Sequence, residues 1–163
     1  MTTEPQRIYW DSCVYISCIE GTPDRVDVLH KILQLAEAGE IVFVASALVI
    51  AEVSRIKNSA ADVAEQAKTI RAFFENDFIA VRGVDRKTAE DAAEIGRQTG
   101  LRGADCVHVA TAIRWKCRSF QTYDGEMGNP KKLLAFNGKI GVPPLTIELP
   151  RIPDQIRQLR LPT

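Results

Sequence analysis

The sequence predicts a three-layer α/β/α sandwich with a central parallel sheet. Short, nearly continuous apolar runs such as EIVFVA are typical of strands that are buried on both faces. Segments with apolar residues at helical spacing lie between these runs. Strands that alternate with helices along a chain form parallel sheets covered by helices. The length of 163 residues fits one compact domain, which we expect at 1–149, followed by a C-terminal tail at 150–163.

The first half of the chain is expected to form strands at 7–10 and 40–45 and helices at 11–20, 22–38, 46–58 and 61–76. Asp11 or Ser12 begins the first helix, and Gly21 ends it. Thr22-Pro23 is a start signal and Gly39 a stop signal for the second helix. Ser46 is the expected N-cap of the third helix, which would carry Glu52 in its interior.

The second half is expected to form strands at 78–84 and 119–124, with helices at 85–100 and 104–117 between them. The helix ADCVHVATAIRWKC is almost entirely apolar, so we expect it to be central. The segment 128–144 is rich in loop-forming residues, and LTIEL at 145–149 is expected to be an edge strand.

Composition excludes several classes of protein. Lys plus Arg and Asp plus Glu both number 21, so any grip on nucleic acid must be local rather than a matter of bulk charge. No apolar run approaches the ~20 residues of a membrane span, and MTTEPQR lacks a signal sequence, so we expect a soluble cytoplasmic protein. The four cysteines form no CxxC pair and only two histidines are present, which argues against zinc and favours free, buried thiols.

Four acids stand where parallel strands end or helices begin. Asp11 follows the first strand, Glu52 lies in the helix after the second, Asp105 opens the apolar helix, and Asp124 follows the fourth strand. The carboxyl ends of parallel strands border the crevice in which α/β proteins place their chemistry. Buried carboxylates repel one another without a cation, and oxygen ligands without Cys or His indicate Mg²⁺ or Mn²⁺.

Each of these residues also has a purely structural interpretation. Asp11, Asp105 and Asp124 are suited to capping helices or forming turns, whereas Glu52 lies too deep in its helix to be a cap. His108, one turn after Asp105, is expected to be a packed core imidazole rather than a catalytic base. The convergence of all four acids at one sheet edge is therefore the decisive point.

The order of YWDSCVYI, SALVIAEV, ADCVHVATA and QTYD resembles the PIN domain, and most closely the VapC-like ribonuclease toxins of type II toxin–antitoxin systems. The resemblance covers about residues 7–149. It implies a PIN-like sandwich with a pocket of acids that binds Mg²⁺ or Mn²⁺ and cleaves RNA. It assigns the catalytic and metal-binding roles to Asp11, Glu52, Asp105 and Asp124, with Ser12 and Thr122 as supporting hydroxyls.

The resemblance also implies an RNA substrate, a cognate antitoxin protein and a homodimer, without membrane association. The apolar helices at 23–38 and 60–76 are candidate surfaces for the protein partners. Basic residues that lie near the acids along the chain are candidate phosphate contacts, namely Arg55, Lys57, Arg102, Lys131 and Lys132. The implied reaction is metal-assisted hydrolysis of RNA phosphodiester bonds.

Other classes fit less well. A phosphatase of the haloacid-dehalogenase kind needs a second Asp two residues after Asp11, where this chain has Cys13. A response-regulator receiver needs adjacent acids at its first strand and an Asp after its third, and VRGVD is a poor match. The alternative that stays open is a PIN-like binding module for nucleic acid or protein without catalytic activity.

Overall fold

The computed structural model describes residues 4–57, 59–154 and 156, and these contain a five-stranded parallel sheet. The strand order is β3-β2-β1-β4-β5, so β1 is central and β5 is at an edge. The strands are β1 (Gln6–Trp10), β2 (Ile41–Ser46), β3 (Ile79–Arg82), β4 (Ser119–Gln121) and β5 (Thr146–Glu148). The predicted parallel sheet and its edge strand are confirmed.

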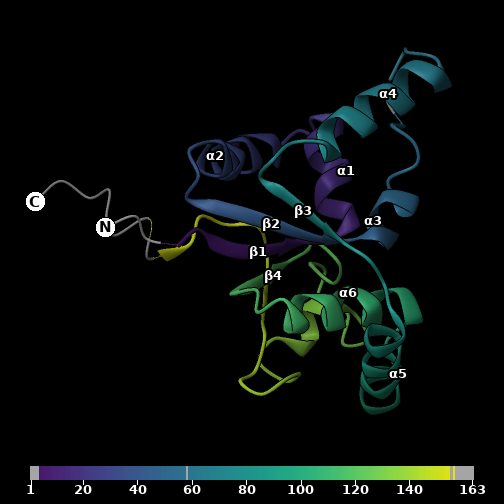
Figure 1. Cartoon of the computed structure of the whole chain (residues 1–163), viewed down its shortest axis with the longest axis vertical. Helices are drawn as coiled ribbons and strands as arrows, with labels where there is room; N and C mark the ends of the chain where they lie inside the picture. The colour runs from purple at the N-terminus through teal and green to yellow at the C-terminus, as the bar shows by residue number, and fades with distance from the viewer. Residues whose placement is uncertain (1–3, 58, 155, 157–163) are drawn as a thin grey trace, which may run out of the picture.

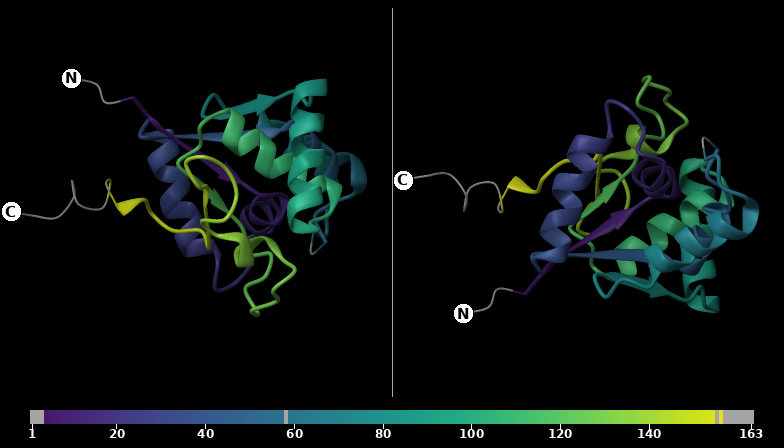
Figure 2. Two further views of the ribbon diagram at one scale, coloured as in Figure 1. Left: turned by 90° about the horizontal axis from the view of Figure 1, so that it is seen from below. Right: turned by 90° about the horizontal axis from the view of Figure 1, so that it is seen from above.

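Helices cover both faces of the sheet, as predicted for a sandwich of three layers (Figure 1). One face carries α1 (Ser12–Glu20), α2 (Val26–Glu37) and α4 (Val63–Phe74), and the other carries α5 (Arg86–Thr99) and α6 (Gly103–Arg114). The views from below and above in Figure 2 show these two layers in turn. The short α3 (Ala47–Glu52) follows β2 directly, and the 3₁₀ helix η1 (Leu133–Phe136) lies between β4 and β5.

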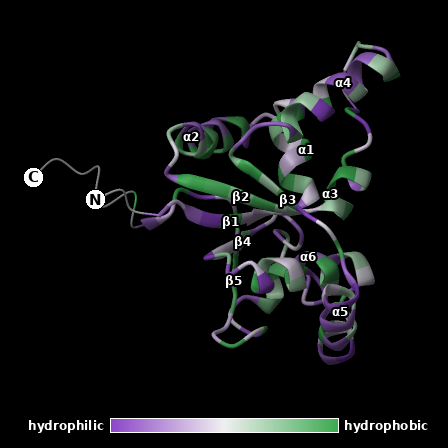
Figure 3. Cartoon of the chain, in the orientation of Figure 1, coloured by the Kyte–Doolittle hydropathy of each residue, from purple (hydrophilic) through white to green (hydrophobic). Residues whose placement is uncertain are grey.

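The central strand β1 is fixed from both faces, because successive side chains of a strand point in opposite directions. Trp10 packs on Phe43 with ring centroids 4.1 Å apart, and its indole Nε1 donates to Gln121 Oε1 at 2.8 Å. Tyr9 stacks on Phe120 at 4.9 Å, on the side of α6. In Figure 3 the strands β2 and β3 are largely hydrophobic, while α5 on the outside is mostly hydrophilic. The packing of this core fixes the strands relative to one another, and so fixes where the segments that follow them begin.

The predicted helix at 46–58 is wrong beyond Glu52, where α3 ends. Val53 leaves the helical conformation, with φ −83° and ψ 60°. The backbone N–H of Lys57 instead donates to Glu20 Oε1 on α1, at 2.7 Å. A tertiary hydrogen bond therefore replaces an intrahelical one, and Glu52 becomes the last residue of a short helix.

Two other predicted boundaries also shift. Asp24 has φ +67°, which interrupts a helix, so α2 begins at Val26 rather than next to Thr22-Pro23. β4 ends at Gln121 rather than at Asp124, because the N–H of Asp124 donates to the side chain of Thr122 at 2.9 Å and the chain turns away from the sheet.

The four cysteines are free thiols, and three of them, Cys18, Cys106 and Cys117, are buried. Within the described residues, no helix has both the length and the apolar character needed to cross a bilayer. The domain boundary after Leu149 stays a prediction, and most of the predicted tail (155 and 157–163) lies outside the described residues.

Candidate active site

The four acids predicted from the sequence line one cavity of about 340 Å³ at the end of the central strand. We call it the acid cavity. Two arginines and several neutral or acidic residues complete its wall: Ser12, Cys13, Arg25, Arg102, Tyr123 and Glu126. The acids come from four separate segments, and the parallel topology brings these segments to one edge of the sheet.

Asp11 is both a helix cap and part of the acid cavity. Its Oδ1 accepts a hydrogen bond from the backbone N–H of Ser12 at 2.8 Å, as the N-cap of α1. Its Oδ2 accepts one from the hydroxyl of Thr122 at 2.8 Å. Both oxygens of the side chain are hydrogen-bonded, and the residue is almost fully buried. The same carboxylate therefore caps a helix and faces the acid cavity.

Asp124 is held by the segment that follows it. Its Oδ2 accepts a hydrogen bond from the N–H of Leu133 at 3.1 Å, and its Oδ1 lies 3.0 Å from Nζ of Lys132. Thr122 links this acid to Asp11, because its oxygen also accepts from the N–H of Asp124. Lys132 thus supplies a positive charge at the rim of the acid cavity.

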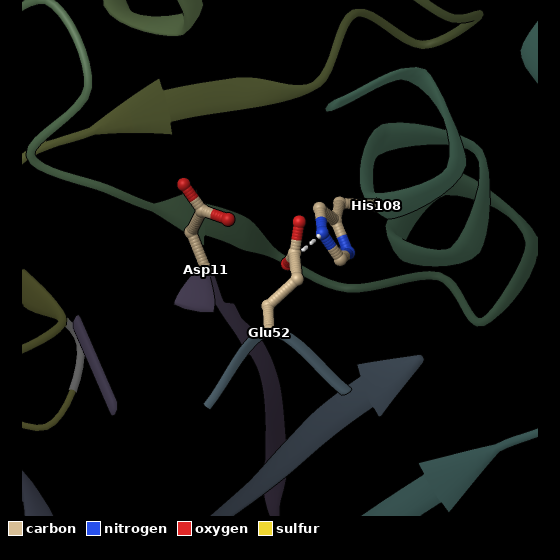
Figure 4. Close-up of side chains that lie close together, drawn as sticks. All are labelled: Asp11, Glu52 and His108. Atoms are coloured by element: carbon tan, nitrogen blue, oxygen red, sulfur yellow. Dashed lines mark hydrogen bonds and ion pairs between the residues drawn. The ribbon is translucent and has the colours of Figure 1, made fainter. Parts of the chain in front are cut away.

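Glu52 approaches Asp11 from the other side and is paired with a buried histidine (Figure 4). His108 Nε2 lies 2.7 Å from Glu52 Oε2, and ligand atoms of Asp11, Glu52 and His108 all lie within 4.8 Å of one another. The hydrogen bond from His108 lowers the pKa of the Glu52 carboxyl below its usual range. Glu52 is therefore ionised at neutral pH.

Asp105 lies in the first turn of α6, and its residue is only 9% exposed. Burial raises the pKa of its carboxyl, and the negative charges of Asp11 and Asp124 raise it further. Arg102 Nε donates to Oδ2 of Asp105 at 3.3 Å, and the positive charge of Arg102 lowers the pKa of this carboxyl. The raised pKa means that burial, together with the two neighbouring acids, outweighs the effect of Arg102.

Of the predicted phosphate contacts, Arg102 lines the acid cavity and Lys132 is paired with Asp124. The other three are exposed and do not line it, namely Arg55, Lys57 and Lys131. Arg25 also lines the acid cavity, but the sequence does not predict it there. Its guanidinium lies 3.8 Å from the centre of the Tyr123 ring and donates to Ser17 Oγ at 3.1 Å. Nothing local marks Arg25 in the sequence, because α2 and the segment after β4 meet only in the folded chain.

The donor set fits a hard divalent cation. Carboxylate oxygens from four segments face one cavity, and no cysteine thiolate or free imidazole dominates the set. Burial is the main cause of the raised pKa of Asp105, and the negative charges of Asp11 and Asp124 add to it. Mg²⁺ or Mn²⁺ beside this carboxyl would favour its ionised form.

Comparison with known proteins identifies a domain family and several solved structures with a similar fold. A model of the PIN domain family matches residues 8–133. A structure of VapBC2 from Rickettsia felis bound to a DNA fragment from its promoter has a TM-score of 0.61 at 17% identity, covering 88% of this chain and 98% of that chain.

Two more solved structures are similar. The Mycobacterium tuberculosis toxin VapC20, described as cleaving the sarcin–ricin loop, has a TM-score of 0.57 at 16% identity, with 73% of this chain and 91% of that chain covered. A toxin–antitoxin complex from Klebsiella pneumoniae has a TM-score of 0.56 at 17% identity, with 76% and 93% covered. No curated protein matches the chain.

Proposed function

This chain belongs to the PIN domain family, and from that premise we propose that it is a divalent-metal-dependent endoribonuclease, the toxin of a toxin–antitoxin pair. The observation that carries the proposal is the convergence of Asp11, Glu52, Asp105 and Asp124 on one cavity. Burial and mutual repulsion make clustered carboxylates energetically unfavourable without a cation. A cluster of four therefore indicates a cation-binding site.

The four carboxylates would hold Mg²⁺ or Mn²⁺, with Asp11 and Asp105 as the most buried members. When bound, such an ion would make a water molecule acidic enough to give up a proton, so that the resulting hydroxide can attack phosphorus, and would stabilise the developing charge. The chain itself would orient the ion and the scissile phosphate, and one of the ionised carboxylates would accept the proton of the attacking water. The backbone N–H of Ser12 and the hydroxyl of Thr122 each donate a hydrogen bond to Asp11.

Arg102 and Arg25 are the basic residues that would hold the phosphate groups of RNA at the acid cavity. The net charge of the whole chain is zero, so binding depends on such local charges. Arg55, Lys57, Lys131 and Lys132 remain predicted contacts for phosphates farther along the strand.

The test combines Mn²⁺ binding by calorimetry with cleavage of a mixed RNA pool in Mg²⁺ or in chelator. Wild type should bind Mn²⁺ and cleave RNA only with the ion. Asp11→Asn and Asp105→Asn should stay folded and lose cleavage by orders of magnitude, because removing a catalytic ion costs several kcal/mol in the transition state. Glu90→Gln, on the exposed surface of α5, is the matched control and should behave as wild type.

The same experiment distinguishes the alternative of a binding module without catalytic activity. A binding module would hold RNA or protein but would not cleave RNA in any ion. If the wild type binds Mn²⁺ and RNA without cleavage, the enzymatic proposal is wrong and the binding module is favoured.

An apolar groove of about 510 Å³ between α3 and α4 is the surface that we propose for the antitoxin. It is lined mainly by apolar side chains, namely Ile50, Val53, Ala67, Ile70 and Phe74. Ile50 is 42% exposed, so the groove presents apolar surface to the solvent, as interaction sites do. The toxin–antitoxin complexes among the similar structures support a protein partner. Homodimerisation remains a separate prediction.

A further inference from the structure

We propose that His108 is a positioning residue, which holds the Glu52 carboxylate at the acid cavity and is itself fixed by Tyr9 and Ser46. The inference rests on the proposed function, because it concerns how one of the four acids is kept in place. His108 is 1% exposed, belongs to α6 and does not line the acid cavity, so it acts through Glu52.

Glu52 is poorly constrained by its own segment. It is the last residue of the six-residue α3, and its side chain is 31% exposed. A glutamate side chain that is fixed in one conformation loses rotamer entropy. The hydrogen bond from His108 Nε2 at 2.7 Å is charge-assisted and strong, so it offsets this loss of entropy before an ion binds.

The hydrogen on Nε2 follows from the surrounding donors and acceptors. An ionised carboxylate only accepts hydrogen bonds, so Nε2 of His108 must donate to Glu52. On the other side, Tyr9 Oη accepts from the N–H of Ser46 at 3.1 Å and lies 2.7 Å from Nδ1 of His108. Burial raises the pKa of Tyr9 well above its ordinary value, so its hydroxyl keeps its proton and is free to donate to Nδ1.

Ser46 completes the support of the ring. Its hydroxyl lies 3.1 Å from Nδ1 of His108 and makes no capping bond to α3, although Ser46 occupies the N-cap position. Both ring nitrogens are therefore engaged, Nε2 by Glu52 and Nδ1 by Tyr9 and Ser46. No lone pair of His108 is left for an ion, which favours positioning over direct ligation even though the ring lies near Asp11.

The support reaches back to the centre of the sheet. Tyr9 belongs to β1, the strand that ends immediately before Asp11, and its ring stacks on Phe120 of β4. Ser46 ends the neighbouring strand β2. Glu52 is thus positioned relative to the strand that Asp11 directly follows, although the two acids lie on different segments of the chain.

The test uses the full chain with three substitutions. His108→Leu removes the donor, His108→Gln keeps an amide N–H near the position of Nε2, and Tyr9→Phe keeps the stacked ring without the hydroxyl. Thermal unfolding of the metal-free proteins checks that each variant is folded. Calorimetry then measures Mn²⁺ affinity, and nitrogen coupling in the Mn²⁺ electron spin resonance spectrum reports direct ligation by the ring.

We expect His108→Leu to weaken Mn²⁺ binding by about 10–100-fold, the usual effect of losing a partner of a metal ligand. His108→Gln should recover most of the affinity, and wild type should show no coupling to a histidine nitrogen. If folded His108→Leu binds Mn²⁺ like wild type, or if His108→Gln is as weak as His108→Leu, the inference is wrong. If His108→Leu does not fold, Tyr9→Phe decides, with a several-fold loss of affinity expected and none overturning the inference.

Nitrogen NMR of labelled histidine in the metal-free protein gives a readout that does not depend on the ion. We expect the hydrogen on Nε2 in wild type and a less defined tautomer in Tyr9→Phe. If wild type fails to bind Mn²⁺ or cleave RNA, the proposed function fails. If wild type binds and cleaves while the His108 variants match it, only the inference fails.

Discussion

Thr122 donates its hydroxyl hydrogen to Oδ2 of Asp11 at 2.8 Å, and the two residues lie 111 positions apart along the chain. The hydroxyl oxygen of Thr122 in turn accepts a hydrogen bond from the N–H of Asp124 at 2.9 Å. One fully buried hydroxyl therefore connects two acids of the cavity across the adjacent strands β1 and β4.

Replacing Thr122 with Val keeps the shape of the side chain and removes this hydroxyl. The buried oxygen of Asp11 and the N–H of Asp124 then each lose a partner, which costs about 1–3 kcal/mol of unfolding free energy. Chemical denaturation should show this loss, and Mn²⁺ affinity should fall because Asp11 is less constrained. Thr122→Ser is the control and should stay near wild type. Equal stability of Thr122→Val and wild type would contradict the assigned hydrogen bonds.

Asp105→Asn should stabilise the metal-free protein at pH 7. Burial raises the pKa of Asp105 in the folded state, so the folded state favours the protonated form and ionisation at neutral pH opposes folding. The gain should shrink as the pH falls towards ~3, where the carboxyl is largely protonated in both states. Thermal unfolding at both pH values without metal checks the sign, and a destabilised variant at pH 7 would refute it. Saturating Mn²⁺ should reverse the order at pH 7, because only wild type gains binding energy.

Arg102→Gln should weaken RNA binding without unfolding the protein. Its side chain is 76% exposed at the rim of the acid cavity, so little packing is lost. The slope of log affinity against log salt should fall in magnitude by about 0.7 for a single-stranded RNA. Binding titrations at several salt concentrations measure it, with Arg86→Gln on α5 as the exposed control. The same slope in both variants would exclude a phosphate contact at Arg102.

Ile50→Glu should disrupt binding of the antitoxin while leaving RNA cleavage by the free protein intact. A charge placed in the apolar groove must be desolvated when the partner docks, and loss of a central apolar contact costs about 2 kcal/mol or more, roughly thirtyfold in affinity. Co-expression with the candidate antitoxin and titration of the purified partners measure the effect. Val63→Glu is a suitable control, since Val63 is 73% exposed on α4 and does not line the groove. Unchanged affinity of Ile50→Glu would place the partner elsewhere.

Much of the fold is predictable because it depends on local patterns. Buried strands such as EIVFVA and the apolar helix α6 are specified by their own residues, although α6 ends at Arg114 rather than at the predicted Cys117. The end of α3 is not predictable in this way, because a side chain of α1, Glu20, takes the N–H of Lys57. Propensity alone extends the helix across that point, and tertiary contacts override it.

The candidate site shows the same division. The acids are visible in the sequence because each interrupts an apolar context near a strand end. Arg25 leaves no such mark, and its place at the acid cavity depends on how α2 begins after the turn at Asp24. For His108 the sequence favoured a buried imidazole, but its partners on β1, β2 and α3 depend on the register of three elements.

The pairing of β1 with β4 also sets when the site exists during protein synthesis. Tyr9 pairs with Phe120, so β1 can pair with β4 only after more than a hundred further residues have been synthesised. Chains emerge from the ribosome at about 5–20 residues per second, and contacts so distant in sequence form late. A nascent chain that has formed only β1, β2 and β3 has Asp11 and Glu52 but neither Thr122 nor Asp124. The acid cavity therefore cannot be complete until the chain has been synthesised as far as Asp124.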